Sequence, residues 1–217
     1  PYYKNVNYTF PKSLRSDSEE LFTFNNAVSE CLINQNKFNN FKRNPYIMEV
    51  VETVGKKLGY QYLKLLKERD DGILKASLKT LLISDDLGNP YKYKYDQYPI
   101  LMSPVTLRYL KVTSDLKLLF GKNFRNIAEI GAGYGGQALI NDYLLNIDSI
   151  KIFDLPNVNM LIQRYLNNFL FNGFYKTTFI NNEGPSNYDL VISNYAFSEI
   201  PRGLQIVYID KVLSKSK

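Results

Sequence analysis

The sequence contains no histidine. A histidine general base, a Ser-His-Asp triad and a histidine-ligated metal centre are therefore excluded. The single cysteine, Cys31, cannot form an internal disulfide, and its place on the apolar stripe of an expected helix indicates a buried, inert thiol. A proton released in any reaction here must go to a carboxylate, a tyrosine, a lysine or water.

Long apolar runs are also absent. No stretch of about 18 uncharged apolar residues exists, and no charged-then-apolar leader precedes the first expected helix. We therefore expect a soluble, cytoplasmic protein that does not bind membranes. The formal net charge is +6, but the lysines are scattered through the chain instead of being massed in one block, so we expect no nucleic-acid partner.

The most informative stretch runs from Asn126 to Gln137. Residues 127–130 form a short apolar run, three closely spaced glycines follow, and residues 137–145 have helical apolar spacing. This order predicts a strand, a glycine turn and a helix. Glycine suits the turn because a Cβ forbids the backbone angles and because a ligand must approach the main chain closely. The first N–H groups of the helix would then face that ligand.

A carboxylate follows at the end of the next expected strand. Residues 149–153, with Ile150, Ile152 and Phe153 as apolar positions, form this expected strand and lead into Asp154, where a carboxylate can accept hydrogen bonds from ribose hydroxyls. Because Gly131, Gly133 and Gly136 also satisfy G-x-G-x-x-G, spacing alone leaves a nicotinamide or flavin enzyme open. A turn that only lets the helix pack on the strand, without any ligand, is another alternative.

The flanking residues favour a different cofactor. Glu129 stands two residues before Gly131, and E-I-G-A-G-Y-G resembles the first motif of class I S-adenosylmethionine-dependent methyltransferases. Residues 154–158, D-L-P-N-V, resemble the second-strand motif of small-molecule O-methyltransferases. Together the motifs most resemble bacterial sugar O-methyltransferases, over residues 126–201. The resemblance implies a Rossmann-like α/β sheet and S-adenosyl-L-methionine as cofactor.

The resemblance also implies which residues contact the cofactor. Glu129 is expected near the ammonium of the methionine moiety and Asp154 at the ribose. Asn181 and Asn182 follow the third expected strand, where amides can read the adenine edge, although a polar turn explains them equally well. The full set of expected contacts is Glu129, Gly131, Ala132, Gly133, Gly135, Gln137, Asp154, Leu155, Asn181, Asn182 and Asn194.

The residues before the glycine turn are expected to be mainly helical. Asn44-Pro45 predicts the start of a helix that Gly59 ends or kinks, and Ser103-Pro104 predicts another. The resemblance implies that the latter helix covers the cofactor, with Arg108 as a contact. We therefore expect a helical accessory region over residues 1–102, which covers the substrate, and an S-adenosylmethionine-binding domain over residues 103–217.

The tyrosines of residues 91–98 alternate with polar residues. Such a run fits an aromatic wall over a sugar ring, a stacking platform for nucleic acid, or a strand or loop that packs its rings on the core.

Two further strands are expected, over residues 177–180 and 189–193. A class I methyltransferase normally has seven strands, and these bring the expected number to four. We therefore expect that the sheet is truncated after its fourth strand in this chain; the alternative is that the accessory region is assigned wrongly.

The segment that leaves the fourth strand, residues 194–201, is expected in the crevice where parallel α/β sheets bind ligands. Glu199 is the first candidate for a general base and Tyr195 the second, while a helix-end carboxylate is the alternative role of Glu199. N-Y-A-F lacks the Asn/Asp-Pro-Pro-aromatic motif of enzymes that methylate nucleic-acid amines, and no ligand spacing indicates a metal.

The sequence therefore predicts transfer of a methyl group to a hydroxyl of a sugar or related small molecule. The alternative is an NAD(P)-binding Rossmann-type oxidoreductase or a non-catalytic nucleotide-binding module.

Overall fold

The computed structural model describes residues 19–216 except 52, 96–97, 99 and 181–185. Its centre is a parallel sheet in the order β5-β4-β3-β6, and the strands are β3 (Asn123–Ile130), β4 (Asn146–Phe153), β5 (Phe174–Thr178) and β6 (Leu190–Ile192). The expected Rossmann-like α/β class is confirmed. The strand order reverses between β3 and β6, which is where such sheets bind ligands.

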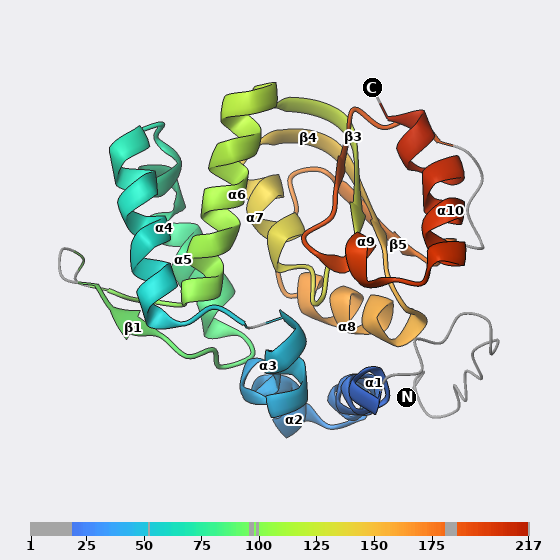
Figure 1. The fold of residues 1–217 in the computed structure, drawn as a ribbon. Helices are drawn as coiled ribbons and strands as arrows, with labels where there is room; N and C mark the ends of the chain where they lie inside the picture. Colours follow the sequence, from blue (N-terminus) through green and yellow to red (C-terminus); the bar gives the residue numbers. More distant parts are fainter. Residues whose placement is uncertain (1–18, 52, 96–97, 99, 181–185, 217) are drawn as a thin grey trace.

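Helices cover both faces of the sheet (Figure 1). One face packs on α6 (Pro104–Phe120), α7 (Gly136–Leu144) and α8 (Pro156–Leu166), and the other packs on α10 (Arg202–Lys211). The sequence dictates this because side chains alternate along a strand. Ile127 belongs to the larger core, whereas Ala128 and Ile130 belong to the core under α10.

The third strand lies a few residues earlier than its apolar run suggested. β5 begins at Phe174 and ends at Thr178, and it forms the edge of the described sheet. Its side chains alternate between exposed and half-buried positions. A strand whose side chains are this exposed needs no continuous apolar run. The apolar run at 177–180 therefore led to a predicted strand position that is a few residues too late.

The N-terminal part is helical, as the sequence predicts, apart from a short hairpin of β1 (Tyr93–Lys94) and β2 (Leu101–Met102). The larger core extends without a break from these helices to the sheet, and the division at residue 102 stays a prediction. No helix in the described ranges is both long and apolar enough to cross a membrane. The helices are α1 (Glu19–Ile33), α2 (Gln35–Asn39), α3 (Pro45–Val51), α4 (Lys56–Arg69) and α5 (Ile73–Asp86).

Gly59 neither ends nor kinks the helix that begins at Pro45, because that helix ends at Val51, so this expectation is wrong. The helical segment is interrupted earlier, between α3 and α4, and Gly59 lies inside α4. A Cβ at this position would lie 2.4 Å from the Tyr95 hydroxyl oxygen and 2.9 Å from the Pro104 Cβ. Glycine is therefore needed because α4 approaches the start of α6 closely.

The tyrosine run packs on this helical region. The side chain of Tyr95 is only 2% exposed, and Lys67 of α4 lies 5.5 Å from the ring centroid of Tyr98. These positions support the packing alternative over the aromatic wall.

Candidate functional site

The glycine turn between β3 and α7 has the backbone that its sequence requires. Gly131, Gly133 and Gly135 have φ values of +73°, +62° and +88°, a region that residues with a Cβ rarely adopt. A Cβ on Gly131 would lie 2.1 Å from the Ala196 Cβ, and one on Gly133 would lie 2.6 Å from Val51 Cγ1. The chain itself therefore approaches the turn closely from α3 and from the segment after β6.

The close approach of Ala196 to Gly131 predicts an effect on stability. Gly131→Ala should lower the free energy of unfolding by about 1 to 2 kcal/mol for the left-handed backbone and by about 1 to 3 kcal/mol more for the clash. Gly72→Ala is the matched control, because Gly72 has a φ of +83° and nothing within 4 Å of an added Cβ. Urea unfolding compares the two, and equal losses would show that the Ala196 contact is unimportant.

Asp154 lies at the end of β4, beside the turn, as predicted. Its Oδ2 accepts a hydrogen bond from the Gly133 N–H at 3.3 Å, and its Oδ1 accepts one from the Leu155 N–H at 2.8 Å. Burial raises the pKa of Asp154 to about 7, although the N–H groups of Leu155, Gly133 and Ala132 lower it. The carboxylate therefore ties the second strand to the glycine turn.

Glu129 is the more unusual carboxylate. It is 2% exposed near the end of β3, and its Oε2 has no hydrogen-bond partner among the residues that the structure describes. Burial, and then the charge of Asp154, raise the pKa of Glu129 to about 8. A buried polar atom without a partner is costly, and it indicates a donor that a ligand could supply.

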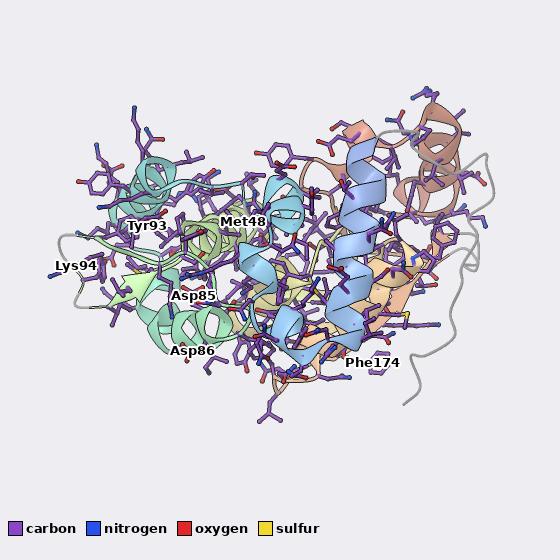
Figure 2. All side chains as sticks on the ribbon, turned by 90° about the horizontal axis from the view of Figure 1, so that it is seen from below. Met48, Asp85, Asp86, Tyr93, Lys94 and Phe174 are labelled. Carbon is purple, nitrogen blue, oxygen red and sulfur yellow. The ribbon has the colours of Figure 1, made fainter. Side chains whose placement is uncertain are left out.

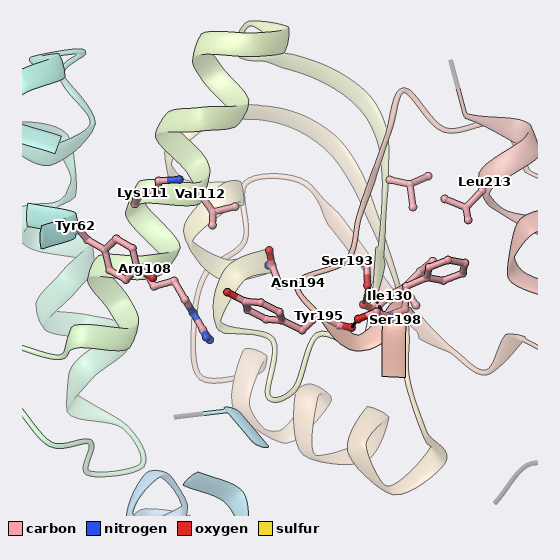
Figure 3. Close-up of a pocket in the computed structure, with 12 residues that line it drawn as sticks. Tyr62, Arg108, Lys111, Val112, Ile130, Ser193, Asn194, Tyr195, Ser198 and Leu213 are labelled. Atoms are coloured by element: carbon pink, nitrogen blue, oxygen red, sulfur yellow. Dashed lines mark hydrogen bonds between the residues drawn. The ribbon is translucent and has the colours of Figure 1, made fainter. Parts of the chain in front are cut away.

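A cavity of about 590 Å³ opens between α6 and the segment that follows β6 (Figure 3). Arg108 and Lys111 line it from α6, and Tyr62 lines it from α4. Ile130 and Ser193 line its floor, at the ends of β3 and β6. The cavity therefore lies at the point where the strand order reverses.

Tyr195 reaches this cavity from a strained turn. Its φ is +76° and its ψ is −40°, values that cost a non-glycine residue about 1 to 3 kcal/mol. Ser193 fixes the turn, because its Oγ donates to the Ile130 carbonyl at 3.1 Å and accepts from the Phe197 N–H at 3.0 Å. The Tyr195 side chain is 68% exposed and lies at the cavity (Figure 3).

Of the other expected site residues, some line the cavity and others do not. Asn194 lines the cavity beside Tyr195. Glu199 is exposed at the last position of α9 (Ala196–Glu199) and does not line the cavity. Asn181 and Asn182 lie outside the described residues.

Gln137 lies buried in the contact between α7 and α6. It is 1% exposed on α7, and its Nε2 donates to the Tyr109 carbonyl at 3.2 Å and to Asn141 Oδ1 at 2.9 Å. These hydrogen bonds join α7 to α6, so we do not assign Gln137 to the cofactor site.

Tyr62 and Lys111 were missed by sequence reasoning. Arg108 and Lys111 are three residues apart and therefore lie on one side of α6, which was the available signal. Tyr62 carries no such signal, because only the packing of α4 beside α6 brings it to the cavity. Within the part of the chain that the structure describes, no group of three or more Cys, Asp or Glu residues could hold a metal ion.

No protein-family model and no curated protein matches this chain. Among solved structures, it is similar to a protein from Thermoplasma acidophilum at 20% identity and a TM-score of 0.40, covering 53% of this chain and 58% of that one. It is also similar to "a putative RNA methyltransferase" from Pyrococcus horikoshii at 18% identity and a TM-score of 0.43, covering 64% of this chain and 68% of that one. The ligand and the reaction are therefore inferred from the geometry of the site.

Proposed function

We propose that the protein binds S-adenosyl-L-methionine and transfers its methyl group to a hydroxyl of a sugar or related small molecule. The observation that carries this proposal is the buried Glu129 oxygen without a hydrogen-bond partner, near the glycine turn. The ammonium of the methionine moiety is a donor of the right charge for it. A charged hydrogen bond of this kind contributes about 1.5 to 3 kcal/mol.

The charges around the turn favour this cofactor over a dinucleotide. Glu129 and Asp154 are close enough for the charge of one to raise the pKa of the other. An ammonium and a sulfonium would favour the ionised form of Glu129 and be attracted to it, whereas a pyrophosphate beside Glu129 would favour its protonated form. The same glycine spacing therefore suits S-adenosylmethionine better than NAD.

The residues of the chain would mainly position the two reactants. When bound, the cofactor supplies an electrophilic methyl group, and in-line alignment with the acceptor hydroxyl provides much of the acceleration. Glu129 would hold the ammonium and Asp154 the ribose hydroxyls. Tyr195 replaces Glu199 as the candidate to accept or relay the hydroxyl proton, because Tyr195 lies at the cavity and Glu199 does not.

The cavity supports a small acceptor. Its volume of about 590 Å³ falls within the range of about 300 to 1,000 Å³ that small-ligand sites occupy. Tyr62 and Tyr195 supply aromatic surface, and Asn194 and Ser198 supply neutral hydrogen-bonding groups. A sugar ring needs this combination.

Asp154→Ala tests the cofactor site. The variant should weaken S-adenosylhomocysteine binding roughly 10-fold or more, because two hydrogen bonds from the ribose to a carboxylate are lost. The control is Asp148→Ala, which removes an exposed carboxylate earlier on β4. Calorimetry measures both, and unchanged affinity in Asp154→Ala would refute the ribose assignment.

Product analysis tests the reaction itself. Wild-type protein with isotopically labelled S-adenosylmethionine and a panel of free and nucleotide-activated sugars should yield a labelled methyl ether. Reduction of NAD by the same panel would support the oxidoreductase alternative instead.

A further inference from the structure

Asn159 lies near the start of α8 and is only 7% exposed. Its amide Nδ2 donates one hydrogen bond to the main-chain carbonyl of Asp154 at 2.9 Å and another to that of Thr178 at 2.9 Å. Asp154 directly follows β4, and Thr178 is the last residue of β5. The Asn159 side chain therefore links the ends of two neighbouring strands to the helix that follows them.

The main chain of Asp154 is held through both of its polar groups. Its N–H donates to the Thr178 carbonyl at 3.3 Å, and its carbonyl accepts from Asn159. The direction that a side chain can take depends on the backbone from which it projects. By fixing the main chain of Asp154, these two contacts also fix where its carboxylate meets the Gly133 N–H.

The Asn159 amide is costly to keep in this place. Its Oδ1 is buried and has no hydrogen-bond partner among the residues that the structure describes. An apolar side chain of similar size would avoid that cost. The Thr178 carbonyl already accepts from the Asp154 N–H, so the amide is needed chiefly for the carbonyl of Asp154.

We propose that Asn159 is a positioning residue, which holds the Asp154 carboxylate where it can bind the ribose hydroxyls of S-adenosylmethionine. This inference rests on the proposed function, in which Asp154 binds those hydroxyls. Asn159 contacts neither the ribose nor the transferred methyl group, and it acts through the main chain of Asp154. A displacement of about 1 Å at a binding group is enough to remove a large part of its effect.

Calorimetry with two matched ligands tests the proposal. The ligands are S-adenosylhomocysteine and its 2′-deoxy analogue, which lacks one hydrogen bond to the carboxylate. Wild-type protein should bind the first roughly tenfold more tightly. Asn159→Ala should lose most of this preference, whereas a variant that is merely destabilised would keep it. Asn159→Gln should retain part of the preference, because its amide keeps both donors.

A matched control and a double variant assign the effect. Asn168→Ala is the control, because Asn168 Nδ2 also donates to two main-chain carbonyls, those of Arg164 at 2.7 Å and Tyr165 at 3.2 Å, and it should keep the preference. Asn159→Ala combined with Asp154→Ala should bind S-adenosylhomocysteine about as weakly as Asp154→Ala alone. The losses should not add, because Asn159 acts through Asp154.

Amide hydrogen exchange tests the same claim without any ligand. The Gly133 N–H donates to Asp154 Oδ2, so its exchange rate reports whether the carboxylate is held. Asn159→Ala should speed exchange at Gly133 roughly tenfold. The Leu139 N–H, which donates to the Gly135 carbonyl at 3.0 Å, should exchange as in wild type and thereby show that the variant is folded.

Three outcomes would overturn the proposal. They are a folded Asn159→Ala variant that keeps the full preference for S-adenosylhomocysteine, one in which Gly133 exchanges at the wild-type rate, and a double variant whose losses add. If Asn159→Ala does not fold, Asn159→Ser is judged by the same criteria, because its hydroxyl can donate to only one of the two carbonyls. Failure of wild-type protein to bind S-adenosylhomocysteine would refute the proposed function, and exchange at Gly133 would still decide whether Asn159 holds the carboxylate.

Discussion

Glu129→Gln is expected to weaken S-adenosylhomocysteine binding roughly 10- to 100-fold, because the buried carboxylate would lose its charged hydrogen bond to the ligand ammonium. Glutamine has the same shape and keeps one acceptor oxygen, so the fold should survive. Turnover by the saturated enzyme should be largely unchanged, because in the proposed site Glu129 would contact the ammonium and not the transferred methyl group. A selective loss of kcat with unchanged affinity would contradict this role.

The pH profile makes the same prediction sharper. The pKa of Glu129 is raised to about 8, so in the free protein the carboxyl is mostly protonated at lower pH and must ionise to bind a cation. Wild-type affinity should therefore rise as the pH increases from about 6 to about 8 and fall above that, where the ligand amine loses its own proton. Calorimetry across this range should show that Glu129→Gln lacks most of the rising limb. Asp154, with a pKa of about 7, would supply the part that remains.

The second large effect is expected at Lys42, which is buried among aromatic rings. Its Nζ lies 4.6 Å from the ring centroid of Tyr134 in the glycine turn and 5.1 Å from that of Tyr165, and it donates to the Ser84 carbonyl at 2.8 Å. Burial raises the pKa of the neighbouring Asp85, and the charge of Lys42 is the largest effect that lowers it. Asp85 faces the interior of the molecule whereas Asp86 is exposed (Figure 2).

Lys42→Met should therefore lower the free energy of unfolding by about 3 to 5 kcal/mol, since it removes the cation that most favours the buried Asp85 carboxylate. The control is Lys37→Met, which breaks an exposed ion pair with Glu30 and should cost about 1 kcal/mol or less. Urea unfolding measures both. If the two variants are equally stable, the Lys42 cluster does not stabilise the fold.

Local patterns were enough to predict the centre of the site. The glycine turn, β3, β4 and Asp154 lie within about thirty residues, and each is marked by spacing or by backbone requirements that a single stretch of sequence expresses. The helix from Pro104 was predicted for the same reason, because Ser103 caps it and Gly121 ends it.

Long-range contacts were not predictable in this way. Lys42 and Ser84 are 42 positions apart, and nothing near either residue indicates that they meet. The place of Glu199 depends on the turn at Tyr195, which has a φ that tyrosine rarely adopts. Sequence reasoning ranked Glu199 before Tyr195 as the candidate base, whereas the strained backbone brings Tyr195 to the cavity and Glu199 does not line it.

One measurement tests the central claim most directly, namely titration of wild-type protein with S-adenosylhomocysteine and with NAD under identical conditions. The account predicts that S-adenosylhomocysteine binds and that S-adenosylmethionine displaces it, while NAD gives no binding heat. The reason is that the buried Glu129 oxygen, which has no hydrogen-bond partner among the described residues, suits the ligand ammonium, which NAD lacks. Binding of NAD without binding of S-adenosylhomocysteine would contradict the account and assign the turn to a dinucleotide.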